Sequence, residues 1–382
     1  MQNLLDYLEW RGDLSFARDC FNEVDNLIFS VLAYLDFEEI VPGGTDGGSI
    51  PLLEAAEQLR NTKDKPSSVI TKSFFAQLPT LLVKAAQSTR YRDIKLSNFV
   101  NQVDYERSEQ FSAVVFSMSD ELHFLAFRGT DDTLAGWKED LQMSFMDEVQ
   151  AQKLAAIYLK SVIASLPGSF YLGGHSKGGN LAVFAASQAS EEMRDRILGI
   201  YNNDGPGFQT NIIQSAGYQS ILGKINTLIP RSSVVGMLLE HIEDYKVVGS
   251  YETGIMQHNA FSWKVKGANF VYEEGLSKSS LNINTAVRAW LDQLPFEQRA
   301  IFVEALFEIL QATGARTVRE LSQEMLASSN AMIKTYKNLD PQTQSHLKNV
   351  IEIFFAESQK ALRRSISKEF NLLISKRMPR KK

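Results

Sequence analysis

The chain has 382 residues, of which 44% are hydrophobic and 22% charged, and its formal net charge is -5. This is the composition of a globular protein with a sizeable core, and the modest negative charge argues against nucleic acid as a partner, because phosphate binding usually needs a basic face. The sequence has one cysteine, no basic apolar leader, and no run approaching the roughly 18 apolar residues of a membrane span, so we expect a cytoplasmic protein in which Cys20 is buried.

The first third of the chain has helical periodicity followed by β-rich sequence. Residues 22–37 carry apolar side chains at helical spacing, and further helices are expected at 50–60 and 71–87. Two short β-rich runs, 111–118 and 122–130, are separated by the polar residues SDE, which predicts a hairpin.

From residue 148 onward, strands and helices alternate. After a helix over 148–166, the pattern predicts strands at 169–174, 197–203, 225–229 and 245–250, with helices at 177–190 and 209–222 between them. This alternation indicates right-handed crossovers and a mostly parallel sheet. Beyond residue 276 only helical patterns remain. We therefore divide the chain into N-terminal helical segments (1–110), an α/β core (111–275) and a C-terminal helical extension or cap (276–382).

Residues 174–178 read GHSKG, which fits the G-x-S-x-G nucleophile elbow. In that motif the serine occupies a strained turn between a strand and a helix, and the residues two before and two after it must lack bulk because the backbones approach closely there. The motif follows an apolar strand and opens an apolar helix, which is the arrangement the elbow requires. Ser176 is therefore predicted to be a nucleophile in an α/β-hydrolase-like fold.

A serine nucleophile needs a base, and the chain contains five histidines. His175 adjoins the serine and is expected to pack away from it, His123 lies within a β run, and His346 lies on a late helix. His241 precedes the last strand, whereas His258 follows it, where α/β-hydrolases carry their histidine. We predict His258 as the base.

The acid is less clearly marked. Asp204 ends the strand that follows the nucleophile's helix, at the same edge of the sheet, although an Asp before Gly is also a common turn former. We predict Asp204 as the acid, with Glu240, Glu243 and Asp244 as alternatives, since any carboxylate that reaches the imidazole could orient it. The oxyanion hole is expected to use the backbone N–H of Lys177, directly after the nucleophile, and a second N–H from the segment 127–140, where Gly129 and Thr130 leave an earlier strand end.

These residues resemble the class 3 lipases. That family has a strand ending in F-R-G-S/T, then a Trp and an Asp, and later G-H-S-x-G-G; here 127–130, Trp137, Asp140 and 174–179 match in order and spacing. The resemblance covers about a third of the chain and implies an α/β-hydrolase core with Thr130 as an oxyanion residue.

The chain departs from that family at the acid. Class 3 lipases place the acid in a turn after the next-but-one strand, where this sequence has Arg231, Ser232 and Ser233, and this departure is the reason for choosing Asp204. A second resemblance spans most of the chain: it is similar to a family of Gram-positive bacterial proteins of unknown function related to α/β-hydrolases, which implies the fold and names no substrate.

Together these features predict a serine hydrolase that cleaves a carboxylic ester of a small molecule or lipid through an acyl-enzyme. The alternatives are a thioesterase or peptidase with the same triad and a catalytically silent fold that binds or regulates. The sequence has no metal or cofactor motif. The segment 360–382 has nine Lys or Arg and one Glu; we expect a solvated last helix, with peripheral contact to an anionic membrane as the alternative.

Overall fold

The computed structural model describes residues 2–44, 48–62, 74–104, 109–131, 133–317, 320, 325–353 and 356. The basic segment 360–382 lies outside these residues. Within them, one eight-stranded sheet has its strands in sequence order from β1 to β8. The strands are β1 (Ile50–Pro51), β2 (Lys95–Asp104), β3 (Glu109–Ser119), β4 (Leu122–Phe127), β5 (Ser169–His175), β6 (Ile197–Asn203), β7 (Ile225–Pro230) and β8 (Tyr245–Val248). A separate two-stranded ribbon pairs β9 (Val265–Lys266) with β10 (Asn269–Phe270).

The sheet changes direction at β4. Strands β1 to β4 pair antiparallel, and β4 to β8 pair parallel, so the carboxyl ends of the last five strands lie at one edge. Open α/β sheets place their sites at this edge.

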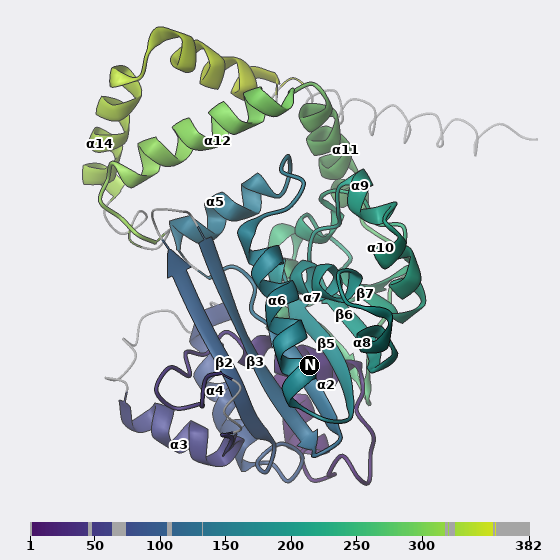
Figure 1. Ribbon diagram of the computed structural model, residues 1–382. Helices are drawn as coiled ribbons and strands as arrows, with labels where there is room; N and C mark the ends of the chain where they lie inside the picture. The colour runs from purple at the N-terminus through teal and green to yellow at the C-terminus, as the bar shows by residue number, and fades with distance from the viewer. Residues whose placement is uncertain are drawn as a thin grey trace, which may run out of the picture.

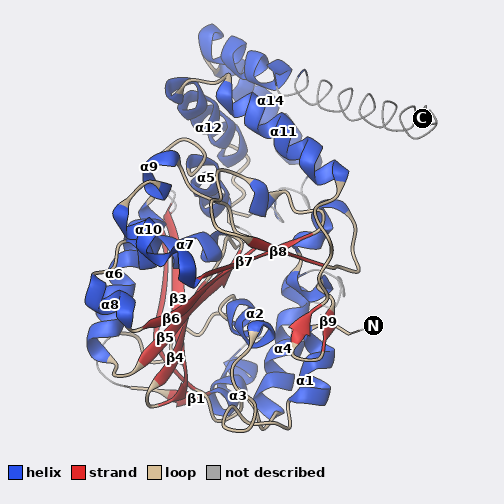
Figure 2. Cartoon of the chain, turned by 90° about the vertical axis from the view of Figure 1, so that its right-hand side faces the viewer, coloured by secondary structure: helices blue, strands red, loops and turns tan. Residues whose placement is uncertain are grey.

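Helices cover both faces of the sheet (Figures 1 and 2). One face carries α1 (Leu4–Arg11), α2 (Glu23–Leu32), α3 (Leu52–Thr62) and α4 (Phe74–Gln87), and the other carries α6 (Gln150–Ser165), α7 (Lys177–Ser187), α8 (Glu191–Asp195), α9 (Thr210–Ile213) and α10 (Ala216–Ile221). Successive residues of a strand point to opposite faces of the sheet and pack into two separate hydrophobic cores. In β4, Phe124 packs with α1 to α4, whereas Leu125 packs with α6 and α7. Burial of both faces explains why β3 and β4 read as nearly continuous apolar runs.

The C-terminal helices lie beyond the carboxyl ends of the strands, next to α5 (Leu134–Gln142) (Figure 1). They are α11 (Lys278–Asp292), α12 (Phe296–Gln311), α14 (Met325–Asn338) and the helical residues 341–353. Leu134 of α5 is buried with Val303 and Phe307 of α12, and Lys138 forms an ion pair with Glu304 at 2.7 Å. None of the helices in the described part of the chain combines the length and apolar character that a membrane span requires.

The α/β-hydrolase-like fold class predicted from the sequence is confirmed. Three local predictions are corrected. Strand β2 was not predicted; it contains four polar residues in its first seven and a register shift between Ser97 and Val100, which interrupt the period of two. The helix expected over 209–222 is broken into α9, α10 and a 3-10 turn, because Ser215 caps α10 by accepting from Tyr218 N at 3.2 Å. Cys20 is exposed rather than buried.

Candidate functional site

Four successive strand ends bring the predicted site residues together. Thr130 lies three residues after β4, Ser176 directly follows β5, Asp204 directly follows β6, and Ser233 lies three residues after β7. These strands pair in parallel, with His175 opposite Asn203 and Asn203 opposite Leu228, so residues far apart in the sequence meet at one edge.

Ser176 occupies the strained turn expected of an elbow. Its backbone angles are φ 58 and ψ -135, a region that non-glycine residues rarely adopt and that the surrounding structure must enforce. Its N–H donates to Asn203 O at 2.9 Å, and it directly precedes α7, whose first N–H groups have no partner within the helix. A Cβ on Gly174 would lie 2.3 Å from the carbonyl carbon of Gly178, which explains why this spacing requires glycine.

Asp204 and His258 form a hydrogen-bonded pair. The Nδ1 of His258 lies 2.6 Å from Oδ2 of Asp204, whose side chain is fully buried, whereas the His258 side chain is 28% exposed. The other carboxylate oxygen accepts from the hydroxyl of Ser233 and from Gly236 N at 3.1 Å. The carboxylate is therefore fixed from both sides. Ser233 lies in the turn where class 3 lipases carry their acid, and here it holds the carboxylate of the neighbouring strand.

The other carboxylates and histidines considered from the sequence lie elsewhere. Glu243 binds His241 Nδ1 at 2.8 Å and also accepts from Tyr218 and Thr227. Burial acts to raise the pKa of Glu243, but the hydrogen bond and charge of His241 outweigh it and lower the pKa to about 2. This second pair does not line the cavity that contains Ser176.

Glu240 and Asp244, the remaining alternatives for the acid, are exposed. Of the remaining histidines, His123 is buried in β4, bonded to Ser117 and Pro167, and His346 bonds to Gln298 O at 3.0 Å.

Ser176 and His258 line the same cavity, of about 600 Å³. Among the contacts of the described residues, the Ser176 hydroxyl has no hydrogen-bond partner, so the imidazole and the hydroxyl are not directly bonded. Catalytic hydrogen bonds are often loose before substrate binds and tighten in the complex.

The cavity wall is predominantly apolar. Its large apolar side chains come from five regions, namely the N-terminal helical region, α5 and its C-terminal end, the turn after β7, the 3-10 turn Gly254–His258 after β8, and the C-terminal helix α11. They include Tyr34, Phe74, Phe75, Trp137, Leu141, Met143, Val235, Leu238, Leu239, Ile255, Met256 and Leu291. Volumes of this size are typical of small-molecule sites with an apolar lining and a few polar groups.

Thr130 is held against α5. Its hydroxyl donates to Oδ2 of Asp140, and both residues line the cavity. Burial raises the pKa of Asp140 to about 6, against the opposing effects of Lys177 and the Thr130 hydrogen bond. The backbone N–H groups of Thr130 and Lys177 take part in none of the hydrogen bonds of the described residues, so both are free to donate to a ligand.

The side chain of Lys177 is buried beneath the elbow, which sequence reasoning did not anticipate. It donates to Glu139 Oε2 at 2.9 Å and to Gln110 Oε1 at 3.0 Å, and it lies 3.7 Å from Asp140 Oδ1. A buried ammonium needs such partners because desolvation is costly. The interaction joins the start of α7 to α5 and β3.

His175 is also placed differently from the prediction. It was expected to pack away from the site, but it lines the cavity and its Nε2 lies 2.8 Å from the backbone oxygen of His258. Tyr34 and Phe74, from the N-terminal helical region, contact its ring. No local signal in the sequence marks these contacts, because they join segments more than 80 residues apart.

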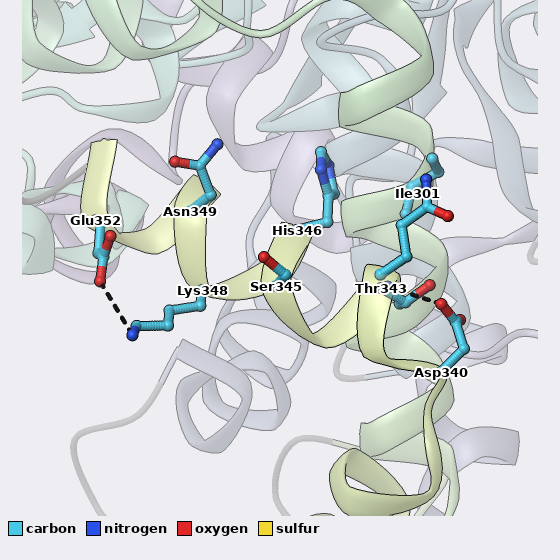
Figure 3. Close-up of a pocket in the computed structure, with 9 residues that line it drawn as sticks. Ile301, Asp340, Thr343, Ser345, His346, Lys348, Asn349 and Glu352 are labelled. Atoms are coloured by element: carbon cyan, nitrogen blue, oxygen red, sulfur yellow. Dashed lines mark hydrogen bonds and ion pairs between the residues drawn. The ribbon is translucent and has the colours of Figure 1, made fainter.

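A second hollow, of about 740 Å³, lies on the C-terminal helices. Figure 3 shows that its labelled polar residues come from one helical stretch, with Ile301 opposite; within that stretch Asp340 accepts from the backbone N–H of Thr343 at 3.0 Å, and Lys348 pairs with Glu352. This hollow lacks a nucleophile paired with a base. Among the described residues, no group of three or more His, Cys, Asp or Glu side chains is arranged to hold a metal ion.

The family model that matches this sequence is described as Mbeg1-like and covers residues 85–308, a range that contains Thr130, Ser176, Asp204 and His258. No curated protein matches the chain. Among solved structures, the crystal structure of M37 lipase is similar over 56% of this chain and 69% of its own, with 13% sequence identity and a TM-score of 0.33.

Proposed function

The chain belongs to the Mbeg1-like family, and we propose that it is a serine hydrolase that cleaves an uncharged carboxylic ester with an apolar acyl group. The observation that carries this proposal is the 2.6 Å bond between His258 and the buried Asp204, in a protein whose strained elbow presents Ser176 to the same cavity. A nucleophile, a base and an acid that orients the base form the arrangement that catalyses acyl transfer.

In the proposed reaction, Ser176 Oγ attacks the ester carbonyl while His258 Nε2 takes its proton. Asp204 accepts the Nδ1–H bond, which leaves Nε2 unprotonated and able to act as base, and it stabilises the imidazolium that forms. His258 then protonates the leaving alcohol, and the acyl-enzyme is hydrolysed by water that His258 deprotonates.

The developing oxyanion would be held by the free N–H groups of Thr130 and Lys177. The N-terminus of α7 adds a positive dipole end at the same place. Because the Thr130 hydroxyl already donates to Asp140, its backbone N–H is the group that remains for the substrate. A single such donor contributes ~10²–10³ in rate.

The cavity supports an apolar acyl group and an uncharged substrate. Two carboxylates, Asp131 and Asp140, line it, while the Lys177 ammonium is occupied by Glu139 and Gln110. An anionic group close to the scissile bond would therefore meet negative charge without a free cation. Esters with an apolar acyl chain, including lipid esters, satisfy both conditions.

The test is labelling of purified protein by a fluorophosphonate probe, followed by hydrolysis of p-nitrophenyl esters and matched thioesters of increasing acyl length. We expect rapid labelling of the wild type that is lost in Ser176→Ala and falls by at least ~10²-fold in His258→Ala.

The matched control is His241→Ala. His241 is bonded to Glu243 at 2.8 Å, as His258 is to Asp204, but does not line the cavity; this variant should label as the wild type does. A folded wild type that neither labels nor hydrolyses any of these esters or thioesters would overturn the proposal in favour of a catalytically silent fold.

A further inference from the structure

His175 is attached to both halves of the site at once. Its backbone is covalently joined to Ser176, and its ring lies against His258, with ring centroids 4.6 Å apart and Nε2 2.8 Å from His258 O. It is 3% exposed. One residue therefore spans the distance between the nucleophile and the base.

The partners of the ring fix its tautomer. The carbonyl oxygen of His258 can only accept, so Nε2 of His175 must carry the hydrogen. In a neutral ring Nδ1 is then an acceptor, and the single hydrogen of Tyr34 OH is shared between Nδ1, at 3.2 Å, and His175 O, at 3.3 Å. Burial, together with the neighbouring His258, holds the pKa of His175 well below its ordinary value, so the ring is neutral and the tautomer is stable.

Two aromatic residues, Phe74 and Tyr34, also pack against the ring of His175. Phe74, the first residue of α4, stacks on it with an interplanar angle of 15° and a centroid distance of 5.6 Å. Tyr34, two residues beyond the end of α2, is buried, and its hydroxyl lies 3.3 Å from His175 O as well. Tyr34 belongs to the N-terminal hydrophobic core, and Phe74 packs against that core.

The 3-10 turn that carries His258 is more exposed than the elbow that carries Ser176. His258 ends a 3-10 turn, Gly254–His258, in which Ile255 is 61% and Met256 is 60% exposed. In the described residues, the side chain of Gln257 accepts from Ser232 N and donates to Glu252 O, Trp263 donates to Gln257 O, and the His258 side chain bonds to Asp204. At His258 itself, Asp204 holds the side chain and His175 holds the backbone oxygen, and the bond from His175 is the one that comes from the elbow.

We propose that His175 is a positioning residue for the base: its Nε2–H holds the His258 backbone at a fixed distance from Ser176, and Tyr34 holds His175. This inference rests on the proposed hydrolase function of the same site. It also assigns a role in catalysis to residues before position 85, the first residue matched by the family model.

Helix α2 supports the elbow by a second route. Asn26 exchanges side-chain hydrogen bonds with Asn203, at 2.9 and 3.1 Å, and Asn203 O accepts the N–H of Ser176. The region from Asn26 to Tyr34 thus fixes the nucleophile through Asn203 and the base through His175.

The test compares His175→Phe, which keeps a ring to stack on Phe74 but loses the donor, with His175→Gln, whose amide can donate to His258 O. We expect kcat for a p-nitrophenyl ester to fall by about 10–100-fold in His175→Phe with KM changed by less than about 3-fold, because a misplacement of about 1 Å costs up to ~10² in rate. His175→Gln should recover most of the loss. Tyr34→Phe should show a smaller loss of the same kind.

The control is His123→Gln. His123 is likewise a buried imidazole whose Nε2 bonds to a backbone oxygen, Pro167 O, at 3.1 Å, but it does not line the cavity. The kcat of the His123→Gln variant should therefore equal that of the wild type. In addition, His175→Phe should have no further effect in a His258→Ala background, since a residue that acts through the base has nothing left to position. An equal loss in both backgrounds, or no recovery in His175→Gln, would overturn the inference.

A readout independent of turnover separates this inference from the proposed function. The Nδ1–H of His258, bonded to Asp204 at 2.6 Å, is expected to give a low-field proton resonance. We expect His175→Phe to broaden or shift this resonance and His175→Gln and His123→Gln to leave it in place. If the wild type does not hydrolyse esters, the proposed function fails, and the spectrum alone then decides whether His175 positions His258. An unchanged resonance in His175→Phe would refute the positioning role.

Discussion

Replacing Asp204 by Asn tests the acid with almost no change in shape. In the wild type, Oδ1 accepts from Gly236 N and Ser233 Oγ, and Oδ2 accepts from His258 Nδ1. An Asn side chain must turn its oxygen toward Gly236, because a backbone N–H can only donate, so its NH₂ group faces His258. The imidazole then has to accept at Nδ1 and carry its hydrogen on Nε2.

That tautomer cannot take a proton from Ser176, so the loss should lie in the chemical step. Where a triad acid is replaced by its amide with the geometry intact, kcat falls by about 10⁴. At about 1.4 kcal/mol per tenfold, this corresponds to ~5.5 kcal/mol of transition-state stabilisation. We expect a loss of about 10³–10⁴-fold in kcat for Asp204→Asn, with KM little changed.

The assay is steady-state hydrolysis of a p-nitrophenyl ester, together with a melting temperature to show that the variant is folded. Ser233→Ala, which removes one donor to the same carboxylate, should lose about 10-fold or less, since Gly236 N still holds Oδ1. Asp244→Asn, at an exposed carboxylate in the same region, is the control and should behave as the wild type. If Asp204→Asn retained a tenth or more of wild-type kcat, Asp204 would not be the acid.

Three further predictions concern the elbow, the N-terminal core and pH. Gly178→Ala would place a Cβ 2.0 Å from Phe127 O, so we expect a loss of unfolding free energy of more than about 2 kcal/mol and of probe labelling, measured by urea titration and by labelling of the folded fraction. Arg90→Ala would leave the buried carboxylate of Asp25, bonded to Arg90 Nε at 2.8 Å, without its cation, and should cost about 3–5 kcal/mol in urea unfolding. Folding raises the pKa of Asp140 from 3.8 to about 6, so ionisation of this carboxyl destabilises the folded state, and the loss is complete above about pH 6. The loss disappears as the pH falls toward 3.8, the pKa of Asp140 in the unfolded chain. Asp140→Asn should therefore be more stable relative to the wild type at pH 7 than at pH 4.5; an equal difference at both pH values in urea unfolding would contradict the assignment.

The parts of the site that sequence reasoning located are those with a local cause. The elbow can be recognised because two glycines at fixed spacing, an apolar strand and an apolar helix all lie within about twenty residues, and the turn that they form depends on backbone sterics alone. The strands from β4 to β8 were visible for the same reason, since alternation and breaker residues are short-range signals. Strand β2 was missed because its polar residues and register shift interrupt that signal.

The partners across the site were decided by the tertiary structure. Asp204 before Gly205 reads equally well as a turn, and it is the placement of Ser233, Gly236 and His258 around it that distinguishes a held carboxylate from a turn former. The sequence by itself determined where a strained serine could be presented and where along the chain the strands from β4 to β8 would lie. The tertiary structure decides which imidazole meets which carboxylate. It also brings Tyr34 into contact with His175, 141 residues away in the sequence. These contacts depend on packing between distant segments, and the local sequence pattern of one segment does not indicate its partner. The physical reason is that periodicity and turn chemistry act over a few residues, whereas the choice of partner depends on how the whole sheet and its helices pack.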